Sequence, residues 1–291
     1  MVKNLLLKSV LLCLLLTSNL TKAMILPPNN LHLEDNPALI ANMSEEEFQE
    51  LIGEVEEIYA PIVKKLGGRL TFETNWDSSQ VNAFARRGSF NRWIVAMFGG
   101  LARRQEVTKD AFQLVVCHEV GHHVAGWPFA YEWASNEGQS DFFASQVCAK
   151  KIWKGDINVN QSFRETVDTL AKEKCDSVYL ATRNQNLCYR IAMAGKSLSK
   201  LLGQMKRLRK MPSFATPDPR EIIETYSRHP RPQCRLDTMF AGALCKTSFD
   251  DRIIPQDERE SLIYSCDQFN PSHNIAYRPK CWLKQEIRGV M

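Results

Sequence analysis

Two spacings of apolar positions divide the first half of the chain into helices and strands. Residues 44–66 carry apolar side chains three and four positions apart, and Ser44 followed by Glu47 is a capping box that marks a helix start. Three shorter stretches alternate apolar and polar residues and are rich in β-branched and aromatic side chains: 69–76, 80–87 and 91–98. The pattern therefore predicts a helix followed by three strands, the last two joined as a hairpin.

A second helical segment, residues 108–125, is apolar along most of its length. Thr108 provides an N-cap, Gly126 ends the helix, and Pro128 cannot continue it. A helix this apolar is expected to be buried. A further helix is predicted from about Tyr131 to Ile152, followed by mostly helical sequence to about residue 210 and a cysteine-rich, loop-rich tail.

These elements predict an α+β fold that is mainly helical, in which a small antiparallel sheet packs on the two helices of residues 108–152. A chain of 291 residues has ample material for a hydrophobic core. We expect a single domain over residues 24–291, with its core at about 44–160 and a helical, cysteine-rich part at about 161–291.

The first 23 residues have the layout of a secretory signal peptide. Lysines near the start precede an uninterrupted apolar run from Val10 to Leu16, and the small residue Ala23 follows. The alternative is an uncleaved anchor, but this run is far shorter than the ~20 residues that span a bilayer. We expect cleavage after Ala23, export to the periplasm or the medium, and no membrane span in the remaining chain.

The charge balance gives no argument for nucleic-acid binding. The formal net charge is +4, and three lysines of the predicted signal peptide account for all but +1 of it: Lys3, Lys8 and Lys22. We therefore expect no nucleic-acid partner.

Eight cysteines remain once Cys13 of the signal peptide is removed. An even number in an exported chain indicates disulfides, and no pair has the short CxxC spacing of a zinc knuckle. Sequence alone leaves the connectivity open. Close spacing favours three pairs and leaves a fourth: Cys175–Cys188, Cys234–Cys245 and Cys266–Cys281, then Cys117–Cys148.

His118, Glu119 and His122 form the pattern HExxH within the apolar helix. Histidines four residues apart share one helix face and can hold one zinc ion, while Glu119 beside them can serve a water molecule as general base. The alternative is a histidine pair without a metal, but the apolar neighbours imply burial, and buried histidines need partners. His123 points away from His122 and is expected only to pack.

The next predicted helix carries Glu137 and Asp141, four residues apart on one face. A catalytic zinc usually takes three protein ligands, and Pro128 stands where a third histidine of the HExxHxxGxxH pattern would be. Glu137 can complete a His–His–Glu site, and Asp141 can accept the free ring N–H of a ligand histidine. The alternative for both carboxylates is a solvated helix face, which the flanking aromatic residues disfavour.

Together these residues resemble the gluzincin metallopeptidases, whose pattern is HExxH on one helix and ExxxD on the next. The order of four motifs resembles the family of the CAAX prenyl endopeptidase and the heat-shock peptidase HtpX: VNAFARRGSFNRWIVAMFGGL, HEVGHH, NEGQSD and HPRPQCR. The match runs from about residue 81 to residue 235. The resemblance implies a zincin-like packing of the sheet on the HExxH and ExxxD helices.

The resemblance also implies a role for each matched residue of the metal site. One zinc ion per chain would be bound by His118, His122 and Glu137. Glu119 would be the base, and Asp141 would orient a ligand histidine.

On the substrate side, the resemblance places Asn82, Ala83 and Phe84 on an edge strand to which an extended peptide adds. His229 and Arg235 would approach the site, with Arg235 anchoring a ligand group or the charged intermediate. The alternative for His229 is a turn before Pro230.

Two features depart from the family. Glu137 follows His122 by only 15 residues, and the family's membrane helices are missing, so a membrane-embedded or prenylated substrate does not carry over. We expect an exported zinc endopeptidase that cleaves extended or unfolded protein segments. The alternative is an exported, disulfide-stapled binding or chaperone-like protein with a structural zinc, which normally has four protein ligands rather than three. The oligomeric state stays open.

Overall fold

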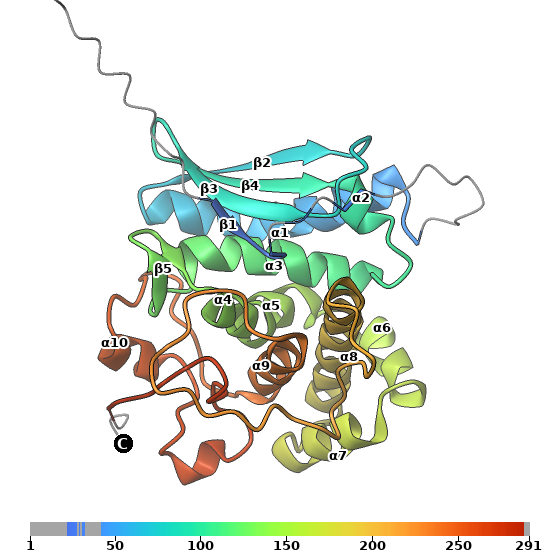
Figure 1. Ribbon diagram of the computed structural model, residues 1–291, viewed down its shortest axis with the longest axis vertical. Helices are drawn as coiled ribbons and strands as arrows, with labels where there is room; N and C mark the ends of the chain where they lie inside the picture. Colours follow the sequence, from blue (N-terminus) through green and yellow to red (C-terminus); the bar gives the residue numbers. More distant parts are fainter. Residues whose placement is uncertain (1–21, 28, 30, 33–41, 288–291) are drawn as a thin grey trace, which may run out of the picture.

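The computed structural model describes residues 22–27, 29, 31–32 and 42–287. The predicted signal peptide lies outside the described residues, apart from Lys22 and Ala23. The fold is α+β: a small sheet lies on one side of a central helix, and a group of helices lies on the other (Figure 1). No helix of the described part is long and apolar enough to cross a membrane.

The main sheet has four strands in the order β1-β3-β4-β2. Strands β3 (Ala83–Gly88) and β4 (Arg92–Phe98) form the predicted hairpin, and both turn residues, Phe90 and Asn91, have the positive φ that such tight turns favour. Strand β2 (Arg69–Asn75), however, runs parallel to β4. The sheet is therefore mixed, and the prediction of an antiparallel sheet was wrong because alternation defines the faces of a strand and not the direction of its neighbour.

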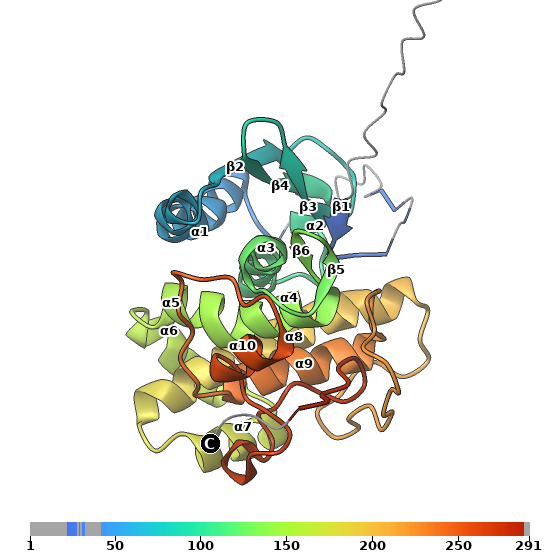
Figure 2. The same cartoon turned by 90° about the vertical axis from the view of Figure 1, so that its left-hand side faces the viewer.

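Strand β1 (Lys22–Met24) comes from the N-terminal part of the chain and pairs antiparallel with β3. In the register of this pairing, Ala23 lies opposite Ala85 and Met24 lies opposite Phe84. Figure 2 shows β1 at the outer side of β3. The edge that was predicted to receive a substrate is thus covered by residues of the same chain.

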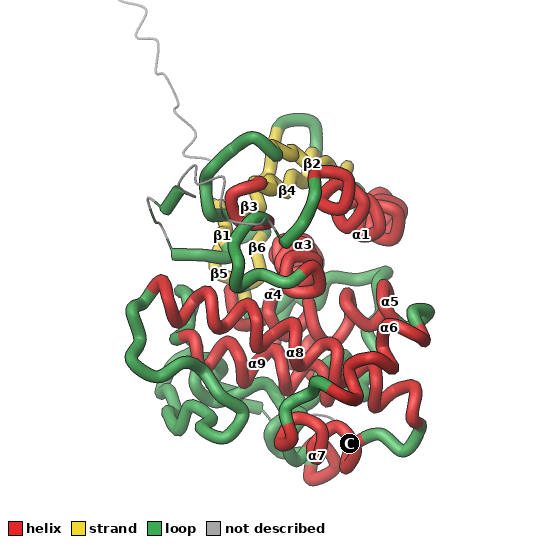
Figure 3. The backbone as a smooth tube through the Cα atoms, turned by 90° about the vertical axis from the view of Figure 1, so that its right-hand side faces the viewer, coloured by secondary structure: helices red, strands yellow, loops and turns green. Residues whose placement is uncertain are grey.

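Two helices, α1 (Glu45–Lys65) and α3 (Lys109–Val124), pack beneath the sheet, and the short helix α2 (Gly99–Ala102) connects β4 to α3. The predicted capping box is present, since Ser44 accepts the N–H of Glu47 and the Glu47 side chain accepts the N–H of Ser44. Thr108 caps α3 in the same way. Every residue from 111 to 124 is buried, because α3 lies between the sheet and the helical layer (Figure 3).

The helix after α3 begins later than its predicted start near Tyr131. Residues 129–135 instead form a small hairpin of β5 (Phe129–Tyr131) and β6 (Ala134–Ser135). Asn136 then accepts the N–H of Gln139 and so starts α4 (Glu137–Phe143). A π-helical turn, η1 (Ala144–Cys148), and α5 (Ala149–Trp153) continue it.

The remaining helices form the layer on the far side of α3. As predicted, the chain is mostly helical to about residue 205. A proline-rich segment without helices follows and precedes the last part. Helices α8 and α9 pack on each other and against α3, α4 and η1 (Figures 1 and 3). The elements of this part are α6 (Ile157–Ser162), η2 (Phe163–Glu165), α7 (Thr169–Val178), α8 (Thr182–Met205), α9 (Pro232–Leu244), α10 (Glu258–Ile263) and η3 (Pro271–His273).

All eight cysteines of the described part form disulfides. Cys117–Cys148 and Cys175–Cys188 are as predicted, whereas the other two are Cys234–Cys281 and Cys245–Cys266. The predicted Cys234–Cys245 pair was wrong because these residues lie at opposite ends of α9. Eleven helical residues separate ends by ~16 Å, far beyond the ~7 Å that a disulfide bridges.

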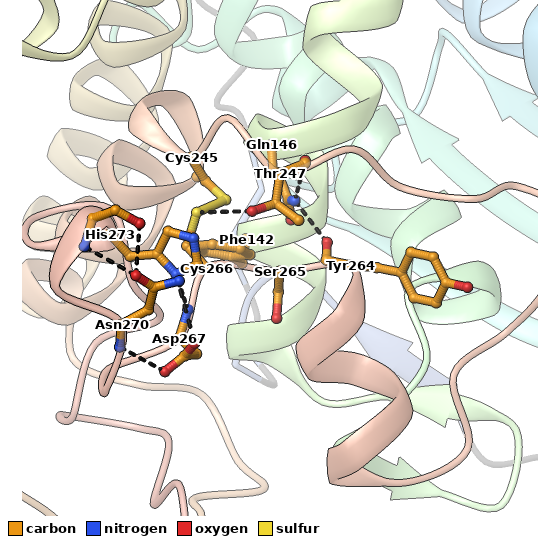
Figure 4. The surroundings of a disulfide bond; sticks show 12 residues. Phe142, Gln146, Cys245, Thr247, Tyr264, Ser265, Cys266, Asp267, Asn270 and His273 are labelled. Atoms are coloured by element: carbon orange, nitrogen blue, oxygen red, sulfur yellow. Dashed lines mark hydrogen bonds and ion pairs between the residues drawn. A yellow bond between two sulfur atoms is a disulfide. The ribbon is translucent and has the colours of Figure 1, made fainter. Parts of the chain in front are cut away.

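The cysteine-rich tail is attached to the turn that follows α4. The side-chain amide of Gln146, in η1, donates to the carbonyls of Thr247 (2.9 Å) and Tyr264 (2.8 Å), which both lie within the loop that the Cys245–Cys266 disulfide closes (Figure 4). The four disulfides indicate an oxidising compartment, as in exported proteins.

Candidate metal centre

His118 and His122 lie one turn apart on the side of α3 that faces α4. Their rings are nearly perpendicular, with centroids 4.6 Å apart, and each residue is only 1% exposed. Glu137, the first residue of α4, points its carboxylate at both rings. Its Oε2 lies 3.4 Å from His118 Nε2, and its Oε1 lies 3.6 Å from His122 Nε2.

These three side chains could hold a metal ion. Tetrahedral ligand atoms at about 2.0–2.2 Å from a metal lie ~3.4 Å from one another, close to the observed separations. Three buried atoms have no hydrogen-bond partner among the described residues: His118 Nε2, His122 Nε2 and Glu137 Oε2. Buried polar atoms that converge without partners are costly, and a metal ion would satisfy all three.

The other ring nitrogens are fixed by neighbours. His118 Nδ1–H donates to Asp141 Oδ1 (2.8 Å), and His122 Nδ1–H donates to the carbonyl of Ser135 (2.8 Å), with the hydroxyl of Ser140 at 3.0 Å. These bonds place the ring protons on Nδ1 and leave Nε2 for a metal. The sequence reasoning missed both serines: Ser140 lies inside NEGQSD, whereas Ser135 acts through its backbone and has no sequence signature.

The close approach of the two helices depends on Gly121, between the histidines. A Cβ atom at this position would lie 3.3 Å from the Cα and carbonyl oxygen of Ser140. Glycine thus lets α4 approach α3 closely enough for Glu137 to reach both imidazoles.

Arg235 lies in α9 and is only 1% exposed, and it connects this helix to the site. Its Nε and Nη2 donate to the two carboxylate oxygens of Asp141, each at 2.6 Å. Burial alone would raise the pKa of Asp141, but Arg235 and His118 outweigh it and hold that pKa below its usual range. Asp141 is therefore an ionised bridge between a ligand histidine and a buried guanidinium.

Neighbouring charges and burial shift the pKa values of the two imidazoles in opposite directions. Burial lowers the pKa of both, but Asp141 outweighs it at His118 and raises that pKa to about 9. The pKa of His122 falls to about 4 because of burial and the neighbouring His118. Burial opposes ionisation of Glu137 too, yet the surrounding histidines keep its pKa below its ordinary value.

Glu119 lies beside the three candidate ligands and is fully buried. Its Oε1 accepts the backbone N–H of Ile25 at 2.9 Å, and its Oε2 has no partner in the described part of the chain. Burial raises the pKa of Glu119 to about 8, so its carboxyl can hold or release a proton near neutral pH.

Of the residues predicted on the substrate side, His229 and Arg235 reach the site. His229 Nε2 lies 3.4 Å from Glu137 Oε1. Arg235 Nη1 donates a hydrogen bond to the carbonyl of Ile25. Asn82 directly precedes β3 and Ala83 and Phe84 begin it, but Phe84 already pairs with Met24 of β1. The structure thus fills the expected peptide position with the chain itself.

His123 lies outside this group, as expected. Its ring stacks between those of Trp93 (5.6 Å) and Trp133 (5.1 Å), and its Nε2–H donates to the carbonyl of Ile94 (3.1 Å). It therefore packs α3 against the sheet.

Comparison with known proteins finds no matching family model, no similar curated protein and no similar solved structure. The resemblance to the gluzincin metallopeptidases accordingly stays a prediction from the motifs. The geometry itself gives a buried His–His–Glu group that could hold a metal, next to the carboxylate of Glu119 and the guanidinium of Arg235.

Proposed function

We propose that this protein is a zinc-dependent endopeptidase that hydrolyses extended or unfolded protein segments outside the cytoplasm. One observation carries the proposal: three metal-ligand atoms converge next to an oxygen of Glu119, and none of the four has a hydrogen-bond partner in the described part of the chain. Two imidazoles and one carboxylate are a usual donor set for catalytic zinc, because they leave a fourth position open. Zinc bound there would polarise a carbonyl group and acidify a water molecule.

The chain's own residues would then move the proton and hold the peptide. Glu119 takes a proton from the attacking water and passes it to the nitrogen of the leaving amine. Its contact with a peptide N–H supports this role, since the carboxylate already lies within reach of an amide nitrogen. Arg235 donates to a peptide carbonyl oxygen, which supports a role in anchoring the substrate backbone.

A binding or chaperone-like protein with a structural zinc is the second candidate. The observation that favours it is His229, because a fourth protein ligand would close the site. A structural site, however, has no use for a buried glutamate with a raised pKa beside the ligands. Catalysis therefore explains more of the site.

The test combines metal analysis with a protease assay. The exported chain should contain one zinc ion and cleave a reduced, carboxymethylated protein. A chelator should remove the zinc ion and abolish this cleavage, and added zinc should restore both. His229→Ala separates the two candidates: it should keep one zinc ion if His118, His122 and Glu137 are the ligands. Cleavage that persists in the chelated, zinc-free chain would refute the proposal.

A further inference from the structure

The N-terminal segment, residues 22–27, enters the candidate site along β3. Its first three residues form β1 and run antiparallel to β3, and the next two, Ile25 and Leu26, are fully buried. An added antiparallel strand is one of the ways in which proteins bind extended peptides. The segment thus has the conformation that an extended peptide would adopt in the same place.

Both backbone groups of Ile25 bind residues of the site. The N–H donates to Glu119 Oε1 at 2.9 Å, and the carbonyl oxygen accepts a hydrogen bond from Arg235 Nη1. The base that serves a leaving amine faces the nitrogen of the residue that follows the cleaved bond. This orientation singles out the bond between Met24 and Ile25.

We propose that the N-terminal segment occupies the substrate groove in the direction and register of a substrate, with the Met24–Ile25 peptide bond at the metal centre. The inference rests on the proposed function and adds the substrate class: an extended chain with a large aliphatic residue just after the cleaved bond. In the reaction, the C–N bond breaks as water adds. The hydroxyl goes to the carbonyl carbon of the first residue, and the proton goes through Glu119 to the nitrogen of the second.

The side chain at position 25 provides the selectivity, because the two contacts with Glu119 and Arg235 use only the backbone. The Ile25 side chain is 0% exposed and belongs to the main hydrophobic core cluster. A charged side chain there would be buried without a partner, which is strongly unfavourable. Downstream, Pro27 borders a pocket of about 290 Å³ whose wall includes Leu202, Met205 and Pro230, so apolar space continues beyond the bond.

Occupation by the N-terminal segment, whether whole or cut at this bond, also regulates the site, since another peptide must displace Ile25 to bind. Both contacts of the segment are on Ile25. They therefore lie downstream of the cleavage predicted after Ala23 and persist in the exported chain, which also keeps the Met24–Phe84 pair of β1 and β3.

The test uses Ile25→Asp in the exported, zinc-loaded chain, with Ile223→Asp as the matched control, because Ile223 is 94% exposed. Ile25→Asp should release the segment, seen as faster deuterium uptake at positions 25 and 26 and in β3 with unchanged uptake in α3. It should also raise cleavage of an unfolded protein at least tenfold over the wild type. Ile223→Asp should change neither.

A capped peptide with the sequence of residues 22–29 gives a second measurement that does not depend on how the variant folds. The wild-type chain should cut it between its methionine and isoleucine, and should leave the same peptide with aspartate for isoleucine intact. If unfolded protein is cleaved but the peptide is cut at another bond, or deuterium uptake is unchanged in Ile25→Asp, the inference is overturned and the proposed function stands. Release of the segment in a chain that cleaves nothing would instead overturn the proposed function.

Discussion

Replacement of Asp141 by asparagine perturbs the centre of the site without changing its size. Asp141 accepts one hydrogen bond from His118 and two from Arg235, and all three residues are at most 1% exposed. The amide has no negative charge, so the buried Arg235 loses the carboxylate that binds it directly and keeps the longer ion pair with Glu137, at 3.7 Å. It also offers one acceptor oxygen where the carboxylate offered two.

Two magnitudes follow from these contacts. Breaking one partner of a buried ion pair costs about 3–5 kcal/mol, a large part of the ~5–15 kcal/mol that stabilises a typical domain. Losing the carboxylate behind a metal-bound histidine typically weakens metal affinity by about 10–100-fold. Asp141→Asn should therefore lower the free energy of unfolding by about 3 kcal/mol or more and weaken zinc binding at least about tenfold.

Urea denaturation of the zinc-free protein measures the first quantity, and competition with a chelating dye measures the second. Asp250→Asn is the matched control, because Asp250 also forms an ion pair with an arginine, but with Arg252, whose side chain is 83% exposed. The control should change neither measurement. A loss of stability under 1 kcal/mol together with unchanged zinc affinity in Asp141→Asn would refute the reasoning.

Two further predictions concern stability. The double variant Cys117→Ser/Cys148→Ser removes the disulfide beside His118, which closes 31 residues and is worth about 4 kcal/mol by loop entropy; an unchanged urea midpoint would contradict this. Burial raises the pKa of Asp237 to about 6. The folded state therefore keeps a proton that the unfolded state releases, so this contribution is complete below about pH 4 and is lost as the pH rises through 6. It amounts to about 1–3 kcal/mol, measured as the difference between wild type and Asp237→Asn at pH 4 and pH 7.5; equal differences at both values would exclude it.

The His–His–Glu group that could hold a metal ion could be predicted from the sequence, because two of its spacings lie within single helices. Residues four apart on one helix share a face, which holds for His118 and His122 and again for Glu137 and Asp141. The apolar neighbours of the HExxH motif predict burial, and the structure places all of α3 from residue 111 onward in the core. The contact between α3 and α4 could be expected because only a short segment connects these two helices.

What could not be predicted depends on pairings between distant segments. β1 is three residues long and has no periodicity of its own, so its place beside β3 follows only from the fold. The fold also decides two further features that no local pattern reveals: the parallel pairing of β2 with β4 and the two disulfides of the tail. The contact of Ile25 with Glu119 spans 94 residues and uses a backbone N–H, for which the sequence carries no signal.

The most direct test of the central claim is the zinc content and peptide-cleavage rate of Glu119→Gln beside the wild type. Glutamine keeps an oxygen for the N–H of Ile25 but cannot take up a proton, so the variant should fold and bind one zinc ion as the wild type does. Its cleavage of an unfolded protein should fall by at least about a hundredfold, the usual contribution of a general base. Wild-type turnover in zinc-loaded Glu119→Gln would contradict the account.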